Sequence, residues 1–173
     1  MIFSVSLYAQ VSLDTAGVYG VMEISFTGPA QTPSSTPNRD IDFWVEFQHE
    51  TGSPAYRVHG FWDGNGNGGA TGNVFKVRFC PTQPGQWNLV NVFSNTPELN
   101  NEKEGDFVIA TTSNHPGYWM VDAASNGSRW YKRSNGSHAY IMGNTHYDFL
   151  SESAGTIAGD VAGNAQYFKK LRF

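Results

Sequence analysis

The stretch from residue 60 to residue 79 constrains the fold more than any other part of this sequence. In residues 74–79, Phe75, Val77 and Phe79 alternate with one valine and two basic side chains. This period of two is typical of a strand with one buried face. The glycine-rich residues 65–69 cannot hold regular structure, and Pro81 and Pro84 stop the strand on its other side. Because a further extended segment follows, the pattern predicts the middle of an antiparallel β-sandwich.

Similar patterns occur on both sides of this stretch. Residues 42–48 alternate, with Phe43, Val45 and Phe47 directed inward. Further strands are predicted at residues 18–26, 56–61, 87–94 and 107–110, whereas the proline-containing residues 28–38 and the polar residues 97–105 are predicted as loops. About seven short strands separated by turns are typical of an immunoglobulin-like sandwich. The Cys-Trp-Cys signature of antibody domains is absent, since Cys80 is the single cysteine, and we expect it to be buried at a strand end.

The pattern changes after residue 117. Asn135-Gly136, between residues 129–133 and 137–143, is the strongest short signal for a β-hairpin. Residues 139–143 are apolar without alternation, as in a strand buried on both faces of a parallel sheet. Apolar residues then recur at helical spacing to the end of the chain, at Ile157, Val161, Ala165, Phe168 and Leu171. The sequence therefore predicts a hairpin followed by the first βα unit of an α/β domain.

Composition argues against several classes of partner. The net charge is −4 and no basic cluster occurs, which disfavours nucleic acid as a partner. No apolar run is long enough to span a membrane. Residues 1–10 resemble the end of a secretory signal, with a first strand as the alternative, and together with the low charge content they indicate a secreted or periplasmic protein.

No cofactor or metal is expected from the motifs. The histidines lack the spacing of zinc ligands. Residues 63–68 resemble the start of a calcium-binding loop, but Val74 stands where such a loop has its glutamate. A loop that connects two strands is therefore the better interpretation.

Two regions together resemble a known family. The order of VYGVMEISF at 18–26, GFWDG at 60–64, VRF at 77–79, PGQW at 84–87 and GDF at 105–107 is similar to the N-terminal Ig-like (DUF5060-type) domain of bacterial glycoside hydrolases. YIMGNTHY at 140–147 resembles the opening strand of the (β/α)8 catalytic domain (DUF4038, apiosidase-like) that follows it. The resemblance implies a remnant of a secretory signal at 1–10, an Ig-like β-sandwich at 11–112, and a linker hairpin with the truncated start of a TIM barrel at 113–173.

The resemblance also implies what the chain cannot do alone. A (β/α)8 barrel takes about 250 residues, and glycoside hydrolysis needs two carboxyl groups that come from later strands in such barrels. We therefore assign no catalytic residue and expect an inactive chain. In a completed enzyme the loop after the apolar strand would contact substrate, with an ordinary polar loop as the alternative; its residues are Asn144, Thr145, His146, Tyr147 and Asp148.

Two of the five tryptophans are candidate glycan platforms. Trp44 falls on the outward side of its strand, and Trp62 adjoins the glycine-rich loop. Packing in the core or between domains is the alternative for all five.

Two functions follow as hypotheses. The first is a non-catalytic accessory sandwich plus the N-terminal fragment of a secreted bacterial glycoside hydrolase, with polysaccharide or oligosaccharide and the remainder of the catalytic domain as partners. The second is a free-standing carbohydrate-binding or cell-surface module.

Overall fold

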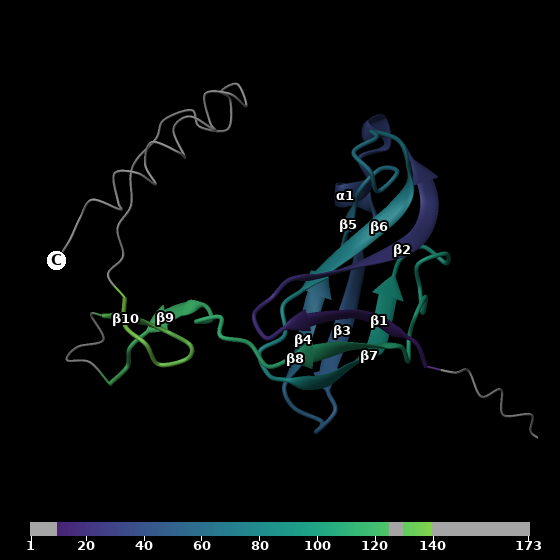
Figure 1. Cartoon of the computed structure of the whole chain (residues 1–173). Helices are drawn as coiled ribbons and strands as arrows, with labels where there is room; N and C mark the ends of the chain where they lie inside the picture. The colour runs from purple at the N-terminus through teal and green to yellow at the C-terminus, as the bar shows by residue number, and fades with distance from the viewer. Residues whose placement is uncertain (1–9, 125–129, 140–173) are drawn as a thin grey trace, which may run out of the picture. The chain divides into compact units, whose positions relative to one another are not determined.

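The computed structural model describes residues 10–124 and 130–139, and the elements discussed below belong to a unit that ends at His138. Its strands form three sheets (Figure 1). The five-stranded sheet has the order β1 (Ser12–Gly17), β8 (Phe107–Thr111), β7 (Gly85–Ser94), β3 (Phe43–His49), β4 (Ala55–His59). The three-stranded sheet has the order β2 (Met22–Gln31), β6 (Gly72–Phe79), β5 (Phe61–Trp62), and β9 (Trp119–Val121) pairs with β10 (Tyr131–Arg133). A 3₁₀ helix, η1 (Pro33–Ser35), and one α-helical turn, α1 (Pro37–Asp40), follow β2.

The prediction of a mainly β fold with antiparallel sheets is confirmed. Every neighbouring pair of strands is antiparallel except β1 and β8, which run parallel. The five-stranded and three-stranded sheets share one core, because aromatic side chains from each contact the other. Phe47 of β3 stacks on Phe79 of β6 with ring centroids 4.1 Å apart, and Phe26 of β2 meets Phe43 of β3 at 4.9 Å. This arrangement fits the predicted sandwich.

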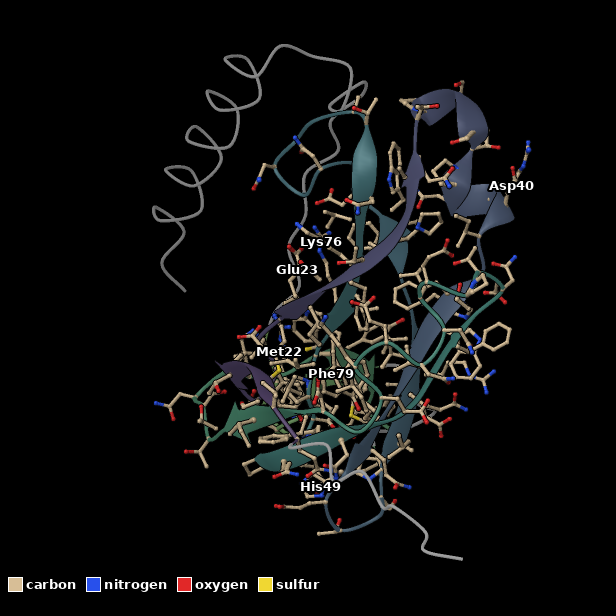
Figure 2. The ribbon with its side chains drawn as sticks, turned by 90° about the vertical axis from the view of Figure 1, so that its right-hand side faces the viewer. Met22, Glu23, Asp40, His49, Lys76 and Phe79 are labelled. Atoms are coloured by element: carbon tan, nitrogen blue, oxygen red, sulfur yellow. The ribbon has the colours of Figure 1, made fainter. Side chains whose placement is uncertain are left out.

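The predicted alternation in β3 and β6 is also confirmed. Phe43, Val45 and Phe47 are buried, as are the three alternate residues of β6 that end in Phe79. Met22 and Phe79, labelled in Figure 2, lie opposite each other on β2 and β6 and belong to this core. The period of two thus identifies the inner face of each sheet correctly.

Two predictions about the bounds of β2 are wrong. The strand expected from residue 18 begins at Met22, since the preceding residues form a turn in which the Gly20 N–H donates to the Gly17 carbonyl. The loop expected from residue 28 begins only after Gln31, because β2 continues through Pro29. β2 is an edge strand of its sheet, where a proline without an N–H is tolerated.

Cys80 is exposed, and the prediction that it is buried is wrong. Phe79 points into the core as the last residue of β6. Alternation therefore turns the next side chain toward solvent. The thiol at this strand end, which was expected to be buried, is therefore exposed to solvent.

The predicted turn at Asn135-Gly136 is confirmed. The Arg133 N–H donates to the Ser137 carbonyl at 2.8 Å, and the Gly136 N–H donates to the Arg133 carbonyl at 2.9 Å. The strand that pairs with β10 is β9, which precedes it in the chain.

Residues 1–9, 125–129 and 140–173 lie outside the described residues, and with them the predicted signal remnant, apolar strand and helix. In the described part of the chain no helix is long and apolar enough to cross a membrane.

Candidate functional site

Trp62 lines a pocket together with residues of the segment that contains α1. α1 lies beside β5 (Figure 1). The pocket has a volume of about 480 Å³. Its lining consists of Trp62 and five residues from the segment between β2 and β3: Pro33, Thr36, Pro37, Asn38 and Arg39. The lining therefore combines an aromatic ring and two proline rings with three polar side chains.

Trp62 is held in place by two hydrogen bonds, one from its indole and one from its backbone. Its Nε1–H donates to the Gly72 carbonyl at 3.0 Å, and its backbone N–H donates to Asn38 Oδ1 at 2.5 Å. The side chain is half-buried and packs against the sandwich core. These contacts fix the plane of the ring and connect the helical turn to strand β5.

Arg39, which lines the pocket, forms a closed charge pair with the neighbouring Asp40. Arg39 donates to the Asp40 carboxylate from Nε at 2.7 Å and from Nη2 at 3.1 Å. Thr36 Oγ1 donates to the same carboxylate at 2.6 Å. The hydrogen bond from Arg39, and after it the one from Thr36, holds the pKa of the Asp40 carboxyl below its ordinary value. The carboxylate is thus charged at neutral pH and balanced by the neighbouring guanidinium.

Trp44 lies on the other sheet, in β3, and both faces of its ring are covered. The Phe93 ring stacks on it with centroids 5.2 Å apart and an interplanar angle of 19°, and the Arg57 guanidinium carbon lies 4.0 Å from the ring centroid. Because β7 and β4 flank β3 on opposite sides, these two groups approach from opposite sides. A sugar could reach only the edge of this indole. The two candidate platforms therefore differ, since Trp62 borders a pocket and Trp44 is enclosed.

A second pocket of about 400 Å³ contains the exposed cysteine. Its lining also includes two arginines and two tyrosines; the residues are Tyr56, Arg57, Val58, Arg78, Phe79, Cys80, Thr82 and Tyr118. Partial burial raises the pKa of the Cys80 thiol. A raised pKa disfavours the thiolate, so this cysteine is not activated as a nucleophile.

The loop that resembles a calcium site uses its polar groups internally. The Asp63 carboxylate lies 2.7 Å from Lys76 Nζ. Asn65 Oδ1 accepts from the N–H groups of Asn67 and Gly69 at 2.9 and 2.8 Å. In the part of the chain that the structure describes, no group of three or more His, Cys, Asp or Glu side chains is arranged to hold a metal ion. The loop connects two strands, as the sequence predicted.

The outer face of the three-stranded sheet holds a cluster of ion pairs. Lys76 Nζ lies 2.7 Å from both Glu23 Oε1 and Asp63 Oδ2, and Arg78 donates to Glu23 Oε2 at 2.9 Å. Figure 2 shows Glu23 and Lys76 next to each other. Hydrogen bonds from Lys76 first and Arg78 second lower the pKa of Glu23. The Asp63 and Glu23 carboxylates raise the pKa of Lys76.

These shifts predict how Glu23 contributes to stability. A carboxyl whose pKa is lower in the folded state stabilises the fold above its ordinary pKa and loses that contribution on acidification. We therefore expect Glu23→Gln to lower Tm at pH 7, and we expect the Tm difference from the wild type to narrow as the pH falls below 4.5, the ordinary Glu value. Thermal unfolding from pH 7 to pH 3 measures it, with Glu98→Gln as control because Glu98 is exposed and without an ion pair among the described residues. A Tm difference that is constant with pH would contradict the assignment.

Of the predicted site residues, the structure describes Trp44 and Trp62. Asn144, Thr145, His146, Tyr147 and Asp148 lie outside the described residues, so their role stays a prediction. The residues that complete the Trp62 pocket were not predicted, because they lie more than twenty positions earlier in the chain. Pro33 and Pro37 predict a loop. The sequence around them does not indicate that this loop lies beside β5.

Comparison with known families gives one match. The family described as "Domain of unknown function (DUF5060)" matches residues 15–94, which extend from β1 to the end of β7. The comparisons with curated proteins and with solved structures gave no match. The matched range includes the Trp62 pocket, both candidate tryptophans and most of the sandwich core. Residues 15–94 of this chain are therefore similar to DUF5060 domains.

Proposed function

We propose that this chain is the non-catalytic accessory sandwich, with the N-terminal fragment of the catalytic domain, of a secreted bacterial glycoside hydrolase that acts on plant or microbial polysaccharide. The DUF5060 match over residues 15–94 supports the identity of the sandwich. The immunoglobulin-like character of the sandwich and the barrel start are part of this proposal. In it, the sandwich braces the catalytic domain and carries no reacting group itself.

The observation that carries the proposal is the apolar surface around β9 and β10. Five large apolar side chains there are exposed, between 39% and 67%: Tyr118, Met120, Val121, Trp130 and Tyr131. They make up half of the large exposed apolar side chains in the described residues. Exposed large apolar side chains gathered in one short part of the chain are typical of an interaction site. We call these five residues the apolar ribbon.

The geometry of the apolar ribbon favours a following domain as its partner. β9 and β10 form only a two-stranded sheet, and isolated two-stranded sheets are marginally stable in water. Tyr131 is paired with Val121 in this sheet, so their side chains share one face. A domain that packs on this sheet would bury these side chains and supply the stability that the pairing alone lacks.

The test compares this chain with the protein encoded when its reading frame is continued past codon 173. Both are incubated with a panel of pectic and hemicellulosic glycans, and released sugar is measured. We expect release by the longer protein and none by the chain alone. Val121→Lys in the longer protein should also lower its Tm, whereas the same change should leave the unfolding of the sandwich in the short chain unaffected.

Two results would overturn this proposal. One is reproducible sugar release by the 173-residue chain. The other is a reading frame that encodes no further domain or a longer protein without activity on the panel.

The second candidate function, a free-standing carbohydrate-binding or cell-surface module, is favoured by the Trp62 pocket. A fixed aromatic ring in the lining of a pocket is suited to stacking on a ligand. The two candidate functions differ in one requirement. Only the accessory sandwich of a hydrolase needs a catalytic domain that covers the apolar ribbon.

A further inference from the structure

We infer that the pocket between α1 and β5 binds one uncharged sugar unit of a glycan. Trp62 supplies the surface on which the sugar stacks. Asn38 and Arg39, which also line the pocket, supply hydrogen bonds to its hydroxyls, together with Asp40, the ion-pair partner of Arg39. This inference goes beyond a bracing role for the sandwich. It holds whether or not a hydrolase domain follows. Sugar binding by the pocket and the proposed role as part of a hydrolase are therefore tested separately.

The shape and lining of the pocket suit such a ligand. Small-molecule sites have volumes of roughly 300–1,000 Å³ and are mostly apolar with a few placed polar groups. At about 480 Å³, this pocket falls in that range, and its lining combines Trp62, Pro33 and Pro37 with polar side chains. A pyranose has one face of C–H groups and an edge of hydroxyls, which suits a lining that combines an aromatic ring with polar side chains.

The hydrogen bonds of Trp62 make it a rigid surface. Both of its N–H groups are occupied, by the Gly72 carbonyl and by Asn38 Oδ1. The ring therefore offers its π face and no free donor, and its orientation needs no ordering when a ligand arrives. Stacking is the contact that remains for it to make.

Asn38, Arg39 and Asp40 provide both donors and acceptors. Asn38 uses its Oδ1 on Trp62 and makes no hydrogen bond through its amide NH₂ within the described residues. Arg39 binds Asp40 through Nε and Nη2, which leaves Nη1 as a donor. Asp40, labelled on its exposed helical turn in Figure 2, retains acceptor capacity in its carboxylate.

The ion pair of Arg39 and Asp40 favours a neutral ligand. The guanidinium of Arg39 is balanced by the carboxylate of Asp40 at 2.7 Å. A uronic acid placed there would meet the Asp40 carboxylate without an uncompensated cation opposite it, in a chain whose net charge is −4. Neutral hydroxyls, in contrast, can use the donors and acceptors of the pair together.

Affinity electrophoresis in native gels tests this inference. The gels contain xyloglucan, arabinoxylan or galactomannan as neutral probes and polygalacturonate as the acidic probe. We expect at least one neutral polysaccharide to retard the chain and polygalacturonate to have no effect. Trp62→Ala should weaken binding by more than tenfold, and Arg39→Ala by several-fold. Trp130→Ala, which removes an exposed tryptophan outside the pocket, should leave binding unchanged.

The outcomes are decisive even if one variant is unstable. Trp62 packs against the core, so near-UV circular dichroism must show that its variant is folded. Arg39 and Asp40 are exposed, and Arg39→Ala with Asp40→Ala tests the same site without disturbing the core. The inference is wrong if no neutral probe retards the chain, if these variants bind as well as the wild type, or if polygalacturonate binds more strongly. Competition by a proline-rich peptide better than by neutral oligosaccharides would also overturn it.

Discussion

Replacing Trp87 with alanine is expected to lower the free energy of unfolding by about 3–5 kcal/mol, the range for truncation of a large buried aromatic. Trp87 is fully buried in β7. Its ring packs edge-on against Phe79 and His49, with centroids 5.1 Å apart in both pairs. Its Nε1–H donates to the Gln83 carbonyl at 3.1 Å, so the substitution also leaves a carbonyl without its partner. This loss is a large share of the total stability of a domain, which is about 5–15 kcal/mol.

Urea denaturation followed by circular dichroism measures this change. Trp130→Ala is the matched control because the Trp130 side chain is 67% exposed, and its effect should stay within about 0.5 kcal/mol. Equal effects of the two substitutions would contradict the placement of Trp87 in the shared core.

The second large effect is expected at Gly60, where the chain passes from β4 in one sheet to β5 in the other. A Cβ at this position would lie 2.2 Å from Cδ1 and 2.4 Å from Cε1 of Phe43. Phe43 is buried, so its ring cannot move away without disturbing its neighbours. Gly60→Ala should therefore cost about 1–3 kcal/mol as overpacking.

A double mutant separates this contact from other effects of Gly60→Ala. In a Phe43→Leu background the aromatic ring is gone, and adding Gly60→Ala should cost markedly less than it does in the wild type. Urea midpoints of the four proteins give the coupling. A cost that is the same in both backgrounds would show that Phe43 does not cover Gly60.

The inner faces of the sheets could be predicted because their signal is local. In β3 and β6 each second residue is a large apolar side chain, and those residues form the core. In the second half of β7, the alternation of buried and exposed residues is interrupted. Glu46 of β3 is paired with Asn91 and Phe47 with Leu89, so Val90 is an extra residue and the alternation shifts. A bulge of this kind is set by the partner strand and leaves no mark in the sequence of β7 itself.

Other features depend on contacts between distant segments. β1 has few apolar residues and exists because it pairs in parallel with β8, about ninety positions later. The Trp62 pocket has the same origin, since Asn38 Oδ1 binds the Trp62 N–H across 24 positions. Trp44 was identified correctly as outward-facing, but the pairing with β7 and β4 that covers its ring could not be seen from its own strand.

The packing of the two sheets on each other underlies the whole account, because it forms the corner at Gly60 and places α1 beside β5. Nuclear Overhauser effects between aromatic protons test it most directly. The rings of Phe47 in β3 and Phe79 in β6 are parallel within 3° with centroids 4.1 Å apart. We predict strong cross-peaks between these two rings. Their absence in a folded, assigned sample would contradict the sandwich.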